Sequence, residues 1–115
     1  MKVYSLKNCD TCKKAIKWLD AKGVDYQNHD VRADGLEQGA VESIVEALGW
    51  ETAINRRSTT WRGLDDAEKE GLDNAKAVAL ILENPTLMKR PVFVSGDSVI
   101  AGFDAKAQAA VEAVL

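Results

Sequence analysis

The chain has 115 residues, 46% of them hydrophobic and 29% charged, which is typical of one soluble globular domain. It has no apolar run long enough to span a membrane, and its first residues lack the apolar stretch of a secretory signal. A formal net charge of −3 argues against a general nucleic-acid binder. We therefore expect a cytoplasmic protein that binds neither nucleic acid nor membranes directly.

The first thirty residues predict a strand, a helix and a second strand. Residues 3–6 alternate weakly and predict a short strand. Residues 13–22 have helical apolar spacing, and Gly23 stands where a glycine commonly ends a helix. Residues 24–31 predict the second strand. This order is a βαβ opening.

The middle of the chain predicts helices and no strand. Residues 36–48 have helical spacing and end at Gly49, and a broken segment follows them. Asp65 and Asp66 predict the cap of a short helix, and Asp73 predicts the cap of another over residues 74–83. The stretch from about 36 to 84 is therefore an expected all-helical insertion.

The last third of the chain returns to strands. Residues 91–94 and 98–101 predict a β-hairpin with a glycine-containing turn. Asp104 predicts the cap of a final helix. The whole order predicts an α/β fold, in which a four-stranded mixed sheet carries the all-helical insertion, and a single domain over residues 1–115.

The two cysteines of the chain, Cys9 and Cys12, are three residues apart. A disulfide that closes a long loop is impossible, since there is no distant partner. A zinc site is disfavoured because it needs three or four ligands and the chain has only one histidine, His29. The pair is therefore a redox pair, one nucleophile with a bystander, or two inert thiols.

The position of Cys9 favours redox chemistry. A free cysteine has a pKa of about 8.5, and the unpaired N–H groups and dipole at a helix N-terminus lower it. Cys12 falls one turn later, more shielded and near enough to attack a mixed disulfide on Cys9. A CxxC motif in a βαβ unit is typical of a thioredoxin-like (glutaredoxin-like) fold. In that fold Pro91, which opens a strand, is expected to follow a cis peptide bond and to face the cysteine.

Five short segments spread over nearly the whole chain match the motifs of one known family. They are Asn8-Cys9-Asp10-Thr11 ahead of Lys13-Lys14-Ala15, Gly49-Trp50, residues 55–61, Lys89-Arg90-Pro91 and Gly102-Phe103. With them the chain resembles the arsenate reductase-like ArsC/Spx family, and above all its YffB-like branch. The resemblance implies the thioredoxin-like fold with a helical insertion, Cys9 as nucleophile, and glutathione as reductant or co-substrate. It implies no bound cofactor and no metal.

The resemblance also assigns arginines to an anion site. Arsenate reductases of the family hold their oxyanion with three arginines around the cysteine. Arg90 matches the one before the proline, and Arg57, with Arg56 as the weaker choice, matches the one from the insertion. The third is missing, because residues 101–104 contain no arginine. This departure disfavours arsenate and favours an organic anion such as the glutathione carboxylates.

The resemblance leaves more than one function open. The leading hypothesis is a monomeric glutathione-dependent thiol reductase that acts on a small oxidised or anionic substrate through a covalent intermediate on Cys9. Asn8, Thr11 and Pro91 are expected near that substrate, and whether Thr11 contacts the thiolate stays open. Because Cys12 is unusual in this branch, the alternative is an Spx-like redox-sensing regulator that binds RNA polymerase through a CxxC switch. A true arsenate reductase is a further alternative.

Overall fold

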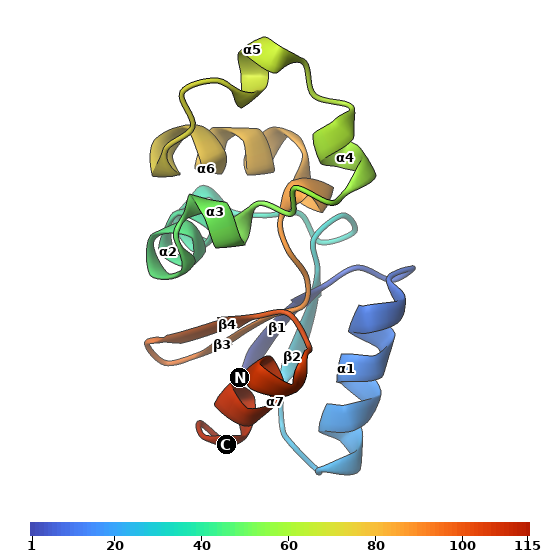
Figure 1. Ribbon diagram of the computed structural model, residues 1–115. Helices are drawn as coiled ribbons and strands as arrows, with labels where there is room; N and C mark the ends of the chain where they lie inside the picture. The colour runs from blue at the N-terminus through green and yellow to red at the C-terminus, as the bar shows by residue number, and fades with distance from the viewer. The chain divides into compact units, whose positions relative to one another are not determined.

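A four-stranded sheet organises the parts of the chain that come first and last in the sequence (Figure 1). The computed structural model describes residues 1–115. The strands are β1 (Lys2–Ser5), β2 (Gln27–Asp30), β3 (Val92–Ser95) and β4 (Ser98–Ala101), in the spatial order β2-β1-β3-β4. β1 is parallel to β2 and antiparallel to β3, and β3 and β4 form an antiparallel hairpin. The predicted four-stranded mixed sheet is confirmed.

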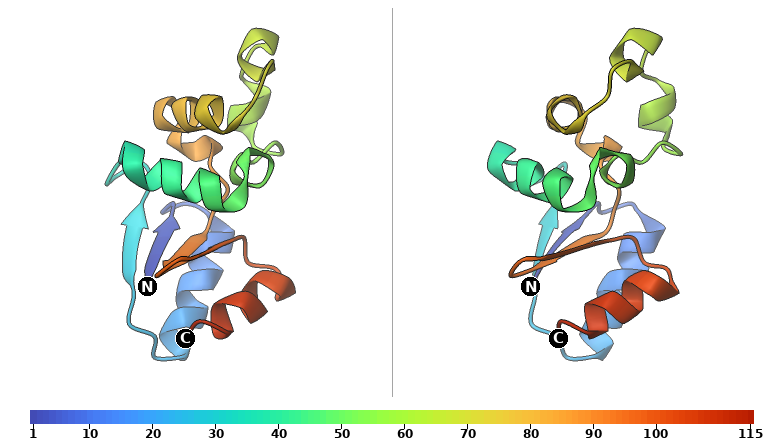
Figure 2. Two further views of the ribbon diagram at one scale, coloured as in Figure 1. Left: turned by 90° about the vertical axis from the view of Figure 1, so that its left-hand side faces the viewer. Right: turned by 60° about the vertical axis from the view of Figure 1, so that its left-hand side comes forward.

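Two helices, α1 (Asp10–Ala21) and α7 (Ala105–Glu112), cover one face of this sheet (Figures 1 and 2). Val3, Phe93 and Ile100 are cross-strand neighbours, so their side chains form one row on that face. Leu19 of α1 and Val111 of α7 pack against the row and are fully buried. This apolar layer fixes the position of α1 against β1, and therefore the position of the cysteines at its start.

The ends of the first elements differ from the predicted ones for local reasons. α1 begins at Asp10 rather than at residue 13, because Cys9 already has the extended backbone of an N-cap, with φ −96° and ψ 116°. Gly23, with φ +68°, ends the helix as predicted. The N–H of Val24 bonds the carbonyl of Leu19 and closes the helix end, so pairing of β2 starts only at Gln27.

The stretch between β2 and β3 consists of short helices, which Figure 1 labels α2 to α6. They are α2 (Gln38–Leu48), α3 (Trp50–Ala53), α4 (Thr59–Arg62), α5 (Asp66–Lys69), α6 (Asn74–Glu83) and the 3₁₀ turn η1 (Pro85–Leu87). α2 packs on α6. Asp65 forms a capping box with Glu68, and Asp73 accepts a hydrogen bond from the N–H of Lys76, so both predicted caps are present. The predicted broken segment in fact contains α3 and α4.

The chain divides into two compact units. The sheet unit comprises Met1–Asp34 and Arg90–Leu115, and the helical unit comprises Gly35–Lys89. That residues 1–115 act as a single domain stays a prediction. None of the helices has both the length and the apolar composition needed to cross a bilayer.

Candidate active site

Cys9 stands at the junction of the β1–α1 loop and α1, as the sequence predicts. Its N–H bonds the carbonyl of Leu6 at 3.1 Å, and its own carbonyl accepts the first helical hydrogen bond, from Lys13, at 3.0 Å. The Cys9 side chain is partly exposed, whereas Cys12 has an exposed fraction of only 2%. Cys9 is therefore the accessible thiol of the pair, and Cys12 is the shielded one.

The surroundings of Cys9 favour its thiolate. Burial acts to raise the pKa of Cys9, but the backbone N–H of Cys12, the Cys12 thiol and the Arg90 guanidinium outweigh it. The pKa of Cys9 is consequently held below that of an ordinary cysteine. Hydrogen bonds from the backbone N–H and the thiol of Cys12 contribute most to this lowering, and the charge of Arg90 adds to them.

The surroundings of Cys12 have the opposite effect. Burial, followed by the hydrogen bond and the negative charge of Cys9, raises the pKa of Cys12 to about 12. The pKa values of two thiols one helical turn apart are thus shifted in opposite directions. Cys12 is therefore protonated at neutral pH, and the thiolate is favoured on Cys9 rather than on Cys12.

Arg90 and Pro91 belong to the same unit as the cysteines. The Arg90–Pro91 peptide bond is cis, as predicted. The carbonyl of the buried Pro91 accepts a hydrogen bond from the N–H of Gly102 at 2.8 Å, which ties the segment before β3 to the residue after β4. The Arg90 guanidinium is close enough to the Cys9 sulfur to hydrogen-bond it. The sheet unit therefore brings together Cys9, Cys12 and Arg90.

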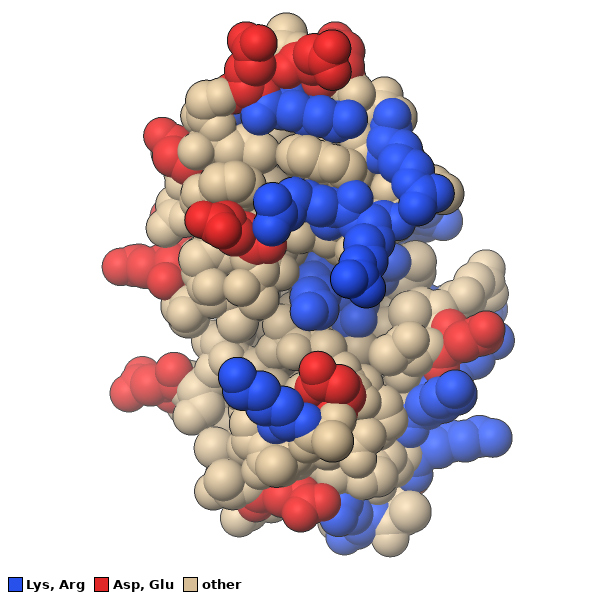
Figure 3. Space-filling view, viewed as in Figure 1, with Lys and Arg blue, Asp and Glu red and all other residues tan.

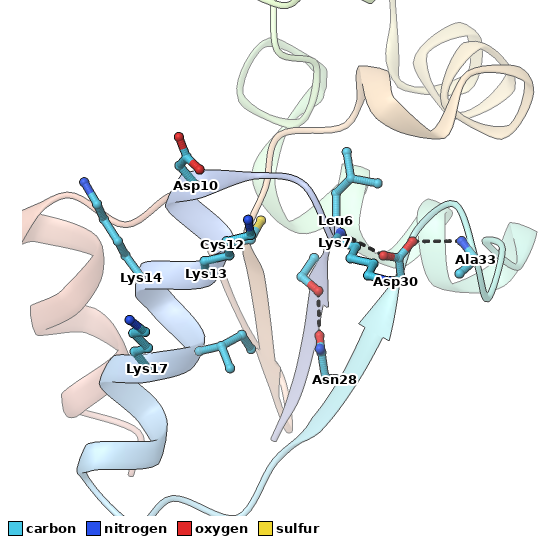
Figure 4. Close-up of a pocket in the computed structure, with 12 residues that line it drawn as sticks. Leu6, Lys7, Asp10, Cys12, Lys13, Lys14, Lys17, Asn28, Asp30 and Ala33 are labelled. Carbon is cyan, nitrogen blue, oxygen red and sulfur yellow. Dashed lines mark hydrogen bonds between the residues drawn. The ribbon is translucent and has the colours of Figure 1, made fainter.

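Asp30, at the end of β2, is a site residue that the sequence analysis missed. One of its carboxylate oxygens, Oδ2, accepts the N–H of Lys7, two residues before Cys9, at 2.8 Å. The other, Oδ1, accepts the N–H groups of Arg32 and Ala33, each at 2.8 Å, and Figure 4 shows the bonds to Lys7 and Ala33. These bonds, that of Ala33 first, hold the pKa of the Asp30 carboxyl below its usual range. An aspartate after a strand and before a turn is the signal that points to such a role.

The remaining predicted site residues lie in two places. Asn8 and Thr11 are exposed and flank Cys9 in sequence, and a contact between Thr11 and the thiolate stays a prediction. Arg56 and Arg57 belong to the helical unit and are exposed. The N–H of Arg57 bonds Asn55 Oδ1 at 3.1 Å, which fixes the local turn. The guanidinium of Arg56 lies 5.9 Å from the ring centre of Trp50.

Within the helical unit, both arginines line a cavity of about 410 Å³ with Lys89. One carboxylate, that of Glu51, also lines the cavity, so three cations against one acid leave a net positive charge that suits an anion. Nowhere in the structure do three or more His, Cys, Asp or Glu side chains gather as a metal site would require.

Known proteins are similar to this chain over almost its whole length. A family model described as the ArsC family matches residues 4–111. An uncharacterized protein of Haemophilus influenzae is 43% identical over 104 residues, which cover 90% of this chain and 91% of that protein. The global transcriptional regulator Spx of Streptococcus pyogenes is 31% identical over 99 residues, covering 84% of this chain and 73% of the regulator. The solved structure of a YffB protein, 40% identical, superposes with a TM-score of 0.90 and covers 99% of this chain and 98% of its own. The chain belongs to the ArsC family.

Proposed function

We propose that this protein is a glutathione-dependent thiol reductase whose nucleophile is Cys9. One observation carries the proposal: the pKa of Cys9 is lowered while that of the neighbouring Cys12 is raised. Arg90 contributes to the lowering at Cys9. Membership of the ArsC family, which includes arsenate reductases, supports thiol chemistry at this position. The similarity to a YffB protein supports the assignment to that branch.

The reaction is a pair of thiol–disulfide exchanges. The Cys9 thiolate attacks a sulfur of the substrate disulfide, so that a new S–S bond forms on Cys9 and the old one breaks. The released thiolate takes up a proton from water. When the substrate is a glutathione mixed disulfide and Cys9 attacks its glutathione sulfur, the glutathione is transferred to Cys9. A second glutathione thiolate then attacks this glutathione sulfur, which releases the Cys9 thiolate and gives glutathione disulfide. Glutathione is therefore the reductant, and the second exchange consumes one glutathione thiol when the substrate is a glutathione mixed disulfide.

Arg90 has two roles in this scheme. Its charge stabilises the Cys9 thiolate before attack, and its planar group suits a carboxylate of glutathione in the encounter complex. Asn8, Thr11 and Pro91 are proposed to line the same substrate position. Arg57 is proposed as a second anion-binding residue, with Arg56 as the weaker choice.

The state of Cys12 favours glutathione over Cys12 as the resolving thiol. A pKa of about 12 leaves almost no Cys12 thiolate at neutral pH. Once Cys9 carries a disulfide, its negative charge is gone, but the burial that raises the pKa of Cys12 remains. Cys12 is then a slow resolving thiol, and external glutathione is the faster one.

One observation favours a second function. The chain is 31% identical to the regulator Spx, and its two thiols are near enough to interact. A redox-sensing regulator that binds RNA polymerase through a Cys9–Cys12 switch is therefore the alternative. Arsenate reduction is less favoured, because residues 101–104 supply no third arginine.

The mass of the intact protein after treatment with glutathione disulfide tests the proposal. Wild type and Cys12→Ser are expected to gain one glutathione, and Cys9→Ala is expected to gain none. Loss of two hydrogens in wild type, without an adduct, would transfer support to the Cys9–Cys12 switch. An adduct that persists in Cys9→Ala would contradict the assignment of the nucleophile.

A further inference from the structure

A groove lies beside the first turns of α1, within the sheet unit (Figure 4). It has a volume of about 750 Å³, and the apolar side chains of Leu6 and Ile16 form part of its lining. Cys12 points into it from α1, so the groove reaches the redox pair from the side of the buried thiol. No role in the proposed chemistry accounts for a groove at this position.

The groove is rimmed by positive charge. Lys7, Lys13, Lys14 and Lys17 line it and are all exposed, and Figure 3 shows basic side chains over α1, at the right of the view. None of these lysines forms an ion pair; the salt bridge of this chain joins Lys22 to Glu112. The carboxylates on the lining are those of Asp10 and Asp30, so four lysines against two acids give a net charge of +2. The whole chain, in contrast, has a net charge of −3.

The spacing of the lysines suits an extended acidic chain. Lys13 and Lys17 are separated by one turn, about 6 Å along the helix axis. Lysines are point charges on flexible stems, whereas a single small carboxylate is better held by the planar fork of an arginine. A row of separate charges beside an apolar floor therefore matches several acidic side chains and an apolar one.

The edge of the sheet at β2 is hindered from binding a polypeptide by strand addition. β2 is an edge strand, and the N–H of Asp30 that points away from β1 is already bonded to the Asp34 carboxylate at 2.9 Å. This bond hinders a partner strand from pairing with the end of β2. A polypeptide in the groove is consequently held by its side chains.

We propose that this groove docks an acidic segment of the protein substrate whose thiol carries glutathione. The inference rests on the proposed function and names its substrate class. Cys9 attacks the glutathione sulfur, glutathione is transferred to Cys9, and the substrate thiol leaves as a thiolate that takes up a proton. The groove accelerates the encounter rather than the exchange itself, so its effect decreases with salt.

The test uses two synthetic peptides, each with one cysteine as the glutathione mixed disulfide. One peptide has four glutamates beside the cysteine, and the other has four glutamines. Release of the peptide thiol gives the second-order rate constant. At low salt the acidic peptide is expected to react about tenfold faster than the neutral one, and the ratio is expected to approach one in about 0.5 M salt.

Matched variants locate the effect. Lys13→Gln/Lys17→Gln should remove most of the preference for the acidic peptide, while Lys2→Gln/Lys106→Gln, with the same change in net charge, should retain it. Glutamine is a good helix former and both groove positions are exposed, so the helix is expected to persist. Equal rates for the two peptides with wild type at low salt, or a preference that survives in the groove variant, would overturn the proposal.

Failure of the chemistry is distinguished from failure of the docking. The neutral peptide reports the reaction of Cys9 alone, so a protein that reacts with neither peptide contradicts the proposed function. Docking is then measured with a fluorescent acidic peptide in which serine replaces cysteine. Weaker binding to the groove variant than to the control variant supports the proposal. Equal binding of the peptide to the two variants contradicts the proposal, and so does displacement of the peptide by reduced glutathione at the same concentration as the peptide.

Discussion

Replacement of Asp30 by asparagine separates two functions of one carboxylate. Oδ2 accepts a hydrogen bond from the N–H of Lys7, in the loop before Cys9. Oδ1 accepts hydrogen bonds from the N–H groups of Arg32 and Ala33. An amide has only one oxygen, so the Asp30→Asn variant has an NH₂ group facing either the loop or the turn, where the backbone also donates. One of the two attachments is therefore lost.

The size of the effect follows from the number and exposure of these bonds. A hydrogen bond to a charged group contributes about 1.5–3 kcal/mol, but Asp30 is only partly buried and solvent screens its charge. We expect the free energy of unfolding to fall by about 1 kcal/mol, measured by urea denaturation, with one or two bonds lost. Because the loop positions Cys9, alkylation of Cys9 by iodoacetamide at pH 7 should be about threefold slower in Asp30→Asn than in wild type.

Asp34→Asn is the matched control for Asp30→Asn. The Asp34 carboxylate accepts the N–H of Asp30 at 2.9 Å and does not contact the loop before Cys9. It should alter stability without slowing the alkylation of Cys9. Equal alkylation rates in the two variants would refute the role of Asp30 in positioning the loop.

The stabilisation by Asp30 depends on pH in a defined direction. Its folded-state pKa is lowered, so the stabilisation is complete above the unfolded pKa, about 3.9, and is lost as pH falls through the lower folded value. The difference in unfolding free energy between wild type and Asp30→Asn should therefore be constant between pH 7 and pH 5. It should shrink below about pH 4. A difference that grows in acid would contradict this assignment.

Three further predictions concern the thiols, the arginine and the core. The alkylation rate of Cys9 should rise with pH and level off at a lower pH than that of an ordinary thiol, while Cys12 stays unmodified at neutral pH. Mass spectrometry that finds equal labelling of Cys9 and Cys12 would contradict this. Arg90→Met should move the midpoint of the Cys9 profile to higher pH and slow alkylation at pH 7 about three- to tenfold, whereas the exposed Arg62→Met should not. Phe93→Ala should cost about 3–5 kcal/mol of unfolding free energy by urea denaturation, because the side chain is 1% exposed, and a loss below about 1 kcal/mol would mean that the core is wrongly described.

Local signals in the sequence were sufficient for most of the fold. Gly23 and the caps at Asp73 and Asp104 mark helix ends through bonds to neighbouring residues, and such bonds leave a pattern in sequence. The helices α3 and α4 were missed because each has only four residues, too few for apolar periodicity to appear.

The candidate site was predictable only in part, because some of its contacts depend on the tertiary fold. The CxxC motif and the start of α1 identify Cys9 without other information. The proximity of Arg90 to Cys9 followed from a family resemblance, since no local pattern links a loop residue to a distant helix start. Asp30 was missed because its bond to Lys7 exists only once β2 pairs with β1. The displacement of the Cys12 pKa likewise required the burial of that side chain to be known.

Turnover of a glutathione mixed disulfide by cysteine variants tests the central claim most directly. Reduced glutathione is the only reductant, and the rate of substrate thiol release is followed for wild type, Cys9→Ser and Cys12→Ser. If Cys9 is the nucleophile and glutathione resolves it, Cys12→Ser should retain most of the activity and Cys9→Ser should fall to the uncatalysed rate. Activity that survives in Cys9→Ser, or that disappears in Cys12→Ser, would contradict the account.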